Sequence, residues 1–330
     1  KRGTVMTTLY IDRKSLTLRA DGDALVFYEQ GERTATVPLR ILERVCMRGD
    51  LMLSAKVLGK LGEAGVGVLV LNGWQKRPTL MLPNWKLDGL RRMAQYAFSQ
   101  DADACLAAAR HTVSAKLAAQ QMFLLKMAAH DAVYAKLLRE HSQAIGRMAD
   151  EAAVCSNMAT LRGLEGAAAA CYFGTWAAVL PEEWAFTGRN KKPPRDPLNS
   201  TLSLVYTLLH FEIVKHLYLS GLDPYIGYYH QVEHGRESLA CDLLEYMRVN
   251  CDHWAISLFT TNTLTPADFS ITARGCYMSK PARILFYQAY DQAAKKWRSQ
   301  IHQLCMDYLA ALARYRKQPD IQMGCLEVME

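Results

Sequence analysis

Short apolar and polar stretches alternate over the first part of the chain. Apolar residues 9–11 and 16–18 are separated from the next alternating stretch by the turn residues 21–23. Short alternating runs divided by Gly and Asp are typical of strands joined in hairpins. A single helix is expected among them, over residues 54–61, and the strand pattern ends near Pro83.

Three glycines follow this helix and precede an apolar strand: Gly62, Gly65 and Gly67. A dinucleotide-binding glycine loop has the opposite order, since it follows a strand and opens a helix. We therefore expect a helix end and a turn here instead of a phosphate-binding loop.

After residue 84 the apolar residues recur at helical spacing, among many Ala, Leu, Met, Gln and Lys residues. Helices are predicted over residues 85–100, 102–139 in one or two pieces, 157–180, 198–219, 237–249 and 280–316. The predicted fold class is thus α+β with two domains. A small β-rich domain spans residues 1–85, and a larger all-α domain spans residues 86–330.

Composition narrows the choice of function only slightly. The 330-residue chain is 50% hydrophobic and carries a formal net charge of +7, a mild excess that favours a polyanionic partner. The nine cysteines form no CxxC pair, which favours buried reduced thiols over a zinc ribbon or a disulfide framework. No apolar run is long enough for a membrane span and no signal peptide is recognisable, so we expect a cytoplasmic location.

Four titratable residues of the second domain are the candidate site: Glu165, His230, Asp242 and Glu245. Asp242 and Glu245 are three positions apart in a predicted helix, so they face one side, where a cation would relieve their repulsion. Glu165 lies among Gly and Ala residues, and it is costly to bury there unless it is paired or bound to a metal. Taken singly, each would be an ordinary surface or core residue.

The sequence around these residues is more specific. The phrases are Leu164-Glu165-Gly166-Ala167-Ala168, Gly221-Leu222-Asp223-Pro224, Gly227-Tyr228-Tyr229-His230 and Asp242-Leu243-Leu244-Glu245. They resemble the CRISPR-associated protein one family, metal-dependent DNA integrases and endonucleases that insert new spacers into a CRISPR array. The resemblance is concentrated between Leu164 and Arg248.

The resemblance implies a site and a reaction. Glu165, His230 and Glu245 would be the metal ligands, and Asp242 an outer partner or a ligand of a second metal. Two carboxylates and an imidazole suit Mg²⁺ or Mn²⁺. A DNA 3′-hydroxyl would attack a phosphodiester at the repeat boundary by transesterification.

Basic side chains near the site are candidates for nucleic-acid binding. Four of them, Arg189, Lys191, Lys192 and Arg195, lie in a polar loop that we expect to be mobile. Such charge runs are most often solvated faces. Arg248 either contacts a phosphate or pairs with Asp242 or Glu245.

Two further features have alternative interpretations. The tyrosines at positions 172, 206, 228 and 229 either stack on bases or pack in the core. Asn199 either orients the site or caps its own helix.

Other histidines and other functions remain as alternatives. We interpret His234 as part of a solvated turn. Glu212 and His216 are four positions apart on a predicted helix, and we interpret them as a surface pair. A nucleic-acid-binding scaffold without catalysis is one rival function. A di-iron enzyme is another, although it would use paired Glu-x-x-His elements that are not found around these ligands.

Partners are implied by the resemblance alone. They are prespacer and CRISPR-repeat DNA, a second copy of the chain bound through the β-rich domain, and CRISPR-associated protein two. Some relatives are fused to a reverse transcriptase. Since residues 1–5 precede Met6, we also expect that the chain belongs to such a fusion or associates with a reverse transcriptase, or that these residues are a cloning remnant.

Overall fold

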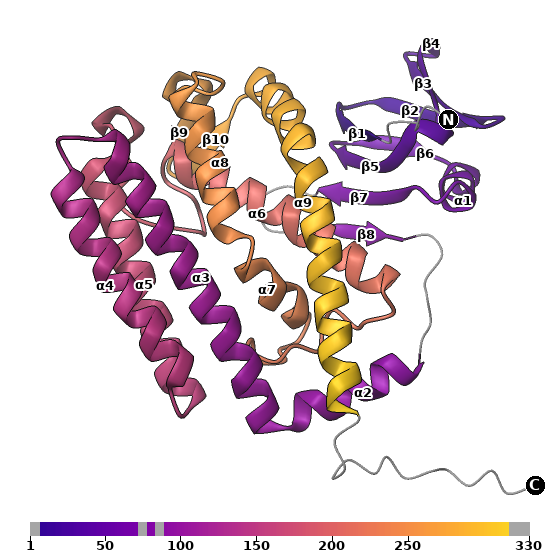
Figure 1. Cartoon of the computed structure of the whole chain (residues 1–330). Coiled ribbons are helices and arrows are strands. Elements are labelled where there is room, and N and C mark those ends of the chain that lie inside the picture. The colour runs from indigo at the N-terminus through magenta and orange to yellow at the C-terminus, as the bar shows by residue number, and fades with distance from the viewer. Residues whose placement is uncertain (1–6, 72–77, 83–88, 317–330) are drawn as a thin grey trace, which may run out of the picture. The chain divides into compact units, whose positions relative to one another are not determined.

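The chain divides into a strand-rich unit, residues 1–87, and a helical unit, residues 88–330. The computed structural model describes residues 7–71, 78–82 and 89–316. The predicted α+β fold class, strands first and helices after, is confirmed (Figure 1). The helix predicted from residue 85 is described from Gly89 onward, and its first positions lie outside the described residues.

The strand-rich unit holds two four-stranded sheets, ordered β1-β5-β7-β8 and β4-β3-β2-β6. Its strands are β1 (Thr7–Asp12), β2 (Leu16–Asp21), β3 (Ala24–Glu29), β4 (Glu32–Pro38), β5 (Leu42–Arg48), β6 (Leu51–Leu53), β7 (Gly67–Leu71) and β8 (Thr79–Met81). β2, β3 and β4 form the predicted antiparallel hairpins, while β1, β5 and β7 run parallel. Side chains from both sheets, such as Leu18 and Val45, meet in one buried core.

The glycine-rich stretch is a turn, as predicted. Helix α1 (Ala55–Glu63) presents Val57 and Leu61 to the core and ends before Gly65. Gly65 has a φ of 73°, a backbone conformation that a residue without a Cβ adopts at little cost. The chain then enters β7 directly.

The helical unit consists of long helices and one hairpin. The helices are α2 (Gly89–Gln100), α3 (Ala102–His130), α4 (Ala135–Val154), α5 (Met158–Val179), α6 (Pro197–Leu219), α7 (Ser238–Glu245), α8 (Arg248–Thr260) and α9 (Lys280–Tyr315). Short 3₁₀ turns lie at Leu39–Ile41, Glu182–Trp184 and Pro266–Asp268. The hairpin joins β9 (Phe269–Thr272) and β10 (Gly275–Met278).

Local sequence explains where several of these helices begin. Asp101, Asn157, Asp196 and Ser279 each accept a hydrogen bond from a backbone N–H in the first turn of the helix that follows. Such caps satisfy N–H groups that have no partner inside the helix. The predicted start of the Glu165 helix therefore agrees with the structure to within a residue or two.

Two predicted elements need correction, and one element was not predicted. Helix α4 extends to Val154, well beyond the predicted end near residue 139. The helix predicted over residues 237–249 is two helices, because the chain turns at Tyr246 and Met247 between α7 and α8. The β9–β10 hairpin was not predicted at all, since its strands are only four residues long.

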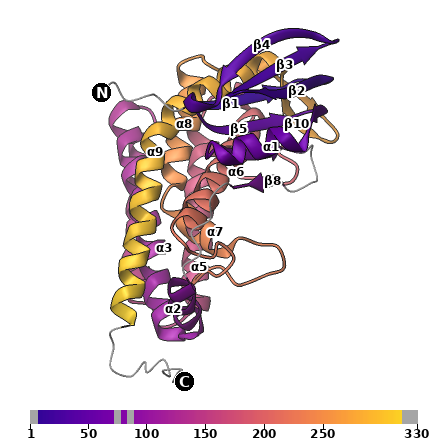
Figure 2. The same cartoon turned by 90° about the vertical axis from the view of Figure 1, so that its right-hand side faces the viewer.

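α6 contributes more buried residues than any other helix in the described part of the chain. α3, α4 and α5 pack side by side, and α6 contacts α7, α8 and α9 (Figure 1). α9 runs along the helical unit (Figure 2). Near one end of α9, Tyr290 packs against Trp254 of α8, and at the other end Tyr315 donates a hydrogen bond to Asp101. This framework fixes α3, α5, α7 and α8 around one cavity.

No helix in the described residues is long and apolar enough to cross a membrane. Six of the eight cysteines in the described part of the chain are buried. Cys171 and Cys241 are partly exposed, and neither lines the cavity described below.

Candidate active site

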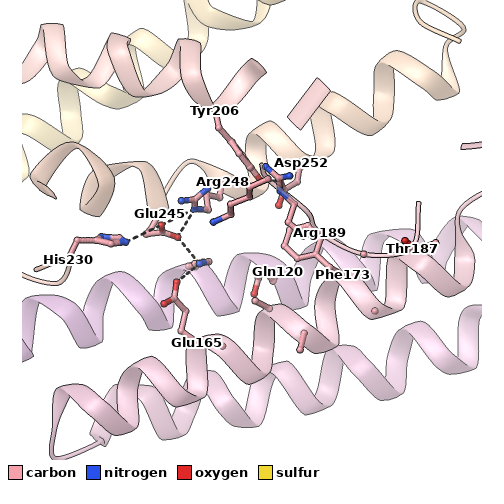
Figure 3. Close-up of a pocket in the computed structure, with 17 residues that line it drawn as sticks. Gln120, Glu165, Phe173, Thr187, Arg189, Tyr206, His230, Glu245, Arg248 and Asp252 are labelled. Carbon is pink, nitrogen blue, oxygen red and sulfur yellow. Dashed lines mark hydrogen bonds and ion pairs between the residues drawn. The ribbon is translucent and has the colours of Figure 1, made fainter. Parts of the chain in front are cut away.

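The structure brings three of the predicted site residues close to one another. Glu165 comes from α5, Glu245 from the last turn of α7, and His230 from the segment between α6 and α7 (Figure 3). His230 Nε2 lies 3.9 Å from Glu245 Oε1. Both carboxylates face the same cation, the ammonium of Lys116.

Lys116 was missed in the sequence. It lies in the middle of α3, and its Nζ atom is 2.5 Å from Glu165 Oε1 and 2.6 Å from Glu245 Oε2 (Figure 3). Burial lowers the pKa of Lys116, but the charges of Glu245 and Glu165 raise it above its ordinary value. The one signal in the sequence is a lysine beside the core residues Val113 and Leu117, a position that a charge occupies only when it is paired.

Asp242 orients His230 and the segment that carries it. Its side chain is fully buried and accepts the backbone N–H groups of Tyr228, Tyr229 and His230 at 2.7, 3.2 and 2.9 Å. His230 Nδ1 lies 2.7 Å from Asp242 Oδ1. A hydrogen donated from Nδ1 to the carboxylate leaves Nε2, the nitrogen that faces Glu245, free to accept a cation.

Gly227 makes this arrangement possible. A Cβ at this position would lie 2.5 Å from Asp242 Oδ2 and 2.9 Å from the backbone carbon of Ser238. The backbone of the Gly-Tyr-Tyr-His phrase therefore passes too close to α7 for any side chain at its first position. The glycine at the start of this motif is thus required for steric reasons in this fold.

Glu165 is held by a second partner. Tyr229 donates its hydroxyl to Glu165 Oε2 at 2.5 Å, so that Oε1 faces the cavity. Arg162, one turn earlier on α5, donates to the backbone oxygen of Tyr229 at 3.1 Å. The Tyr229 hydroxyl therefore holds Glu165 in position, a role that was not among the two considered for this residue from the sequence.

Glu245 is ionised inside the protein. Arg248 Nε lies 2.8 Å from both of its carboxylate oxygens. Burial raises the pKa of Glu245, but the charges of Arg248 and Lys116 outweigh it and hold the pKa well below its usual range. Arg248 therefore pairs with Glu245, which was one of its two predicted roles, and it also lies over the Tyr206 ring at 4.9 Å.

These groups line an open cavity of about 560 Å³. Glu165, His230 and Glu245 form one part of its wall, and Arg189 and Arg248 form another (Figure 3). Lys191 also lines the cavity and belongs with these basic residues. The cavity thus presents an acidic cage beside a basic wall.

The loop that carries Arg189 is held in place, contrary to the predicted mobility. Asn199 donates to Gly188 O at 2.8 Å and accepts from Asn190 N at 3.1 Å and from Arg189 at 2.8 Å. Asp196, and not Asn199, caps α6. The buried Asn199 side chain forms hydrogen bonds with the loop that carries Arg189 and therefore does not cap its own helix.

The predicted basic residues separate into two groups. Arg189, Lys191 and Arg248 line the cavity, whereas Lys192 and Arg195 are exposed and do not.

Asp252 on α8 is a second group that sequence reasoning missed. It accepts a short hydrogen bond from the Tyr206 hydroxyl, and it lines the cavity between the basic residues. Burial raises the pKa of Asp252 to about 6, against the opposing effects of Tyr206 and Arg248.

The other candidates lie apart from the cavity. Tyr172 is fully buried in the core, and His234 lies on an exposed turn. The surface-pair interpretation of Glu212 and His216 is wrong, because Glu212 is buried and its carboxylate pairs with Arg298 at 3.0 Å.

The donor atoms of the acidic cage are suitable ligands for a hard divalent cation. In the described residues, no three His, Cys, Asp or Glu side chains are arranged around a single point as ligands. The Lys116 ammonium takes the position of a cation between Glu165 and Glu245. Ligands on opposite sides of a Mg²⁺ ion are about 4.2 Å apart, so the 3.9 Å from His230 Nε2 to Glu245 Oε1 is compatible with a shared ion.

Comparison with known sequences identifies the family. The family model described as CRISPR associated protein Cas1 matches residues 9–292. The CRISPR-associated endonuclease Cas1 1 of Thermodesulfovibrio yellowstonii is 38% identical over 314 residues, which cover 90% of this chain and 95% of that protein. The CRISPR-associated endonuclease Cas1 3 of Thermus thermophilus is 33% identical over 293 residues, 86% and 83% of the two chains.

Solved structures share the fold. A Cas1 protein from Thermotoga maritima matches with a TM-score of 0.81 at 22% identity, over 93% of this chain and 97% of that one. A casposase bound to an integration product matches with a TM-score of 0.80 at 20% identity, over 95% and 92%. The resemblance inferred from the Glu165, His230 and Glu245 phrases is confirmed, and the chain belongs to the Cas1 family of CRISPR-associated proteins.

Proposed function

We propose that this protein is a divalent-metal-dependent DNA endonuclease and integrase, which joins spacer DNA to a CRISPR repeat. The observation that carries the proposal is that Glu165 and Glu245 share one cation, Lys116, in an open cavity where His230 Nε2 lies 3.9 Å from Glu245 Oε1. The relatives that are most similar here are named endonucleases, and one structural neighbour is a casposase bound to an integration product.

Glu165, Glu245 and His230 would hold Mg²⁺ or Mn²⁺, because carboxylate oxygens and an imidazole are suitable ligands for both ions. Such an ion, when bound, polarises the phosphate and stabilises the charge of the transition state. Cysteine thiolates, which would favour zinc, do not line the cavity in the described part of the chain.

The side chains around the cage would each have a defined task. Asp242 keeps the His230 proton on Nδ1, and Tyr229 holds Glu165 in position. Arg189 and Lys191 on the basic wall would bind the phosphate of the DNA backbone, since guanidinium and ammonium groups pair with phosphate oxygens.

The reaction is a phosphodiester exchange. A DNA 3′-hydroxyl loses its proton and forms a new bond to phosphorus, while the bond to the displaced 3′ oxygen breaks and that oxygen is protonated. In strand cleavage, water takes the place of the attacking hydroxyl. Neither reaction requires a nucleotide cofactor, and positioning with charge stabilisation supplies most of the catalysis.

The expected partners follow from the named neighbours. One structural neighbour, matched with a TM-score of 0.81 at 21% identity, is part of a Cas6-RT-Cas1–Cas2 complex, of whose chain the match covers 36%. We propose that this protein binds prespacer and repeat DNA, forms a homodimer through its strand-rich unit and assembles with CRISPR-associated protein two. Fusion to, or association with, a reverse transcriptase remains part of the proposal.

A strand-joining assay tests the function. Wild-type protein and Glu165→Gln are incubated with a labelled 3′-hydroxyl duplex, a repeat-containing target and Mn²⁺, Mg²⁺ or EDTA. Joining is expected only for the wild type with metal, and the loss in Glu165→Gln should exceed about 100-fold. Glu233→Gln, an exposed control, should retain full activity, and equal joining by Glu165→Gln would disprove the proposal.

A further inference from the structure

Lys116 occupies the centre of the acidic cage. Only 7% of the residue is exposed, and its ammonium forms ion pairs with Glu165 and Glu245 at 2.5 and 2.6 Å. It is the cation that holds these two carboxylates together in this structure (Figure 3).

The cage does not depend on Lys116 alone. Glu165 Oε2 is bonded to the Tyr229 hydroxyl, and both oxygens of Glu245 are bonded to Arg248. Each carboxylate thus has a hydrogen-bond partner other than Lys116. The two carboxylates would therefore stay in place if the ammonium moved away.

The lysine has room to move. It lines the cavity of about 560 Å³, as does Gln120 one turn further along α3. A lysine side chain is a flexible four-carbon stem with a compact charge, so its ammonium can leave the cage while its backbone stays in the helix.

From these contacts we propose that Lys116 is a resident counter-cation, which holds Glu165 and Glu245 together in the metal-free protein and is displaced when a divalent cation binds them. This inference rests on the proposed metal-dependent function. Binding of the metal is then an exchange of cations, and the affinity for the metal is set in part by the lysine that it displaces. The displaced ammonium remains within the cavity, which Lys116 lines.

Metal affinity measured without catalysis tests the exchange. Mn²⁺ is titrated into wild type, Lys116→Met and the control Lys126→Met, and free Mn²⁺ is followed by electron paramagnetic resonance. Lys126 is exposed on the same helix, so its loss removes an equal charge outside the cage. We expect Lys116→Met to bind Mn²⁺ about tenfold more tightly or better, because buried charges left unpaired are costly and the ion now pairs them without competition.

The outcomes separate the two proposals. Unchanged or weaker Mn²⁺ binding by Lys116→Met, beside a binding wild type, would overturn the exchange and leave the proposed function intact. Absence of binding in wild type and Lys116→Met alike would overturn the metal-dependent function itself. If Lys116→Met does not fold, Lys116→Gln provides the same comparison with a neutral side chain that still bonds to carboxylates.

A second measurement uses the unaltered protein. Acetylation of Lys116 by a lysine-reactive reagent is followed by mass spectrometry with and without Mg²⁺. Displacement should raise the labelling of Lys116 severalfold and leave Lys126 unchanged. Equal labelling of Lys116 in both conditions, with Mg²⁺ bound, would contradict the exchange.

Discussion

Asp242 determines which nitrogen of His230 faces the cavity, although it touches no cavity-lining carboxylate. The spacing of Asp242 and Glu245 correctly placed both in one helix and toward one site. The sequence could not show that Asp242 accepts three backbone N–H groups, because those groups belong to a segment without regular structure. Spacing rules apply only to residues within one helix, whereas the Asp242 carboxylate accepts hydrogen bonds from a loop outside its helix.

Replacing Asp242 by Asn should weaken metal binding without unfolding the protein. The amide has the same shape but only one acceptor oxygen, so its NH₂ group faces either the donors of His230 or the backbone N–H groups of Tyr228 and Tyr229, and the imidazole loses its fixed orientation. Loss of such a partner typically costs about 10- to 100-fold in metal affinity. Mn²⁺ titration measures this, with the exposed Asp150→Asn as the control; identical dissociation constants would refute the role of Asp242.

His210 should make stability depend on pH. Burial lowers the pKa of His210, but hydrogen bonds to Cys241 and Glu237 raise it from an ordinary 6.5 to about 9. A group whose pKa is raised on folding stabilises the folded state fully below its unfolded pKa and loses that effect as the pH rises through its folded pKa. This contribution to the unfolding free energy is therefore present at pH 6 and lost between about pH 6.5 and 9.

Urea unfolding midpoints at several pH values measure the effect. The fall in stability from pH 6 to 9.5 should be smaller in His210→Gln than in the wild type. A variant with the same pH profile as the wild type would show that His210 is not the group responsible.

At the scale of elements, the site depends on a turn and a break that helical periodicity does not reveal. α7 ends at Glu245 and α8 begins at Arg248, so the predicted single helix is interrupted at the ligand itself. Apolar residues on both sides continue the helical pattern, such as Leu244 and Val249. Helical periodicity therefore predicted which residues of this segment face the core. Only the packing of α7 and α8 against α6 shows where the helix axis changes direction.

A methyl group at Gly227 should disrupt the site, whereas one at Gly163 should not. The Cβ of Gly227→Ala would lie 2.5 Å from Asp242 Oδ2 and 3.0 Å from Leu239 N, so backbone must shift and the bonds to Asp242 weaken. Overpacking of this kind costs about 1–3 kcal/mol. Gly163 on α5 has no atom within 4 Å of its ideal Cβ, and Gly163→Ala should stabilise the helix by about 0.5–1 kcal/mol.

Thermal or urea unfolding distinguishes the two glycine variants. The result expected is opposite signs of the change, with weaker Mn²⁺ binding in Gly227→Ala only. A neutral Gly227→Ala would mean that the segment before His230 adapts without loss.

At the scale of the whole molecule, the fold class and the three converging residues were predictable, and their surroundings were not. Strand and helix patterns follow from local sequence, and the phrases around Glu165 and His230 carried the site. Lys116 and Asp252 lie on other helices and meet the site only through tertiary packing. Apart from the apolar neighbours of Lys116, the local sequence does not distinguish these two charges from surface charges.

The affinity for DNA should fall as the salt concentration rises, and it should fall more steeply the more phosphate groups the protein contacts. Each contact releases counterions, so the logarithm of the affinity falls linearly with the logarithm of the salt concentration. Arg189→Gln should reduce the magnitude of this slope by about one, because Arg189 lies on the basic wall. Arg139, which is exposed on α4, provides the control Arg139→Gln, and equal slopes for the two variants would argue against a phosphate at Arg189.

The pairing of two acidic with two basic side chains in the cage has a consequence for the order of events. Glu165 and Glu245 are balanced by Lys116 and Arg248, so this quartet is electrically neutral as it stands. Under the proposed exchange, an incoming divalent ion adds two positive charges while the lysine remains nearby. The empty protein would then attract a polyanion weakly at this point, and loading with metal would prepare the cavity for DNA, so that ion binding precedes substrate binding.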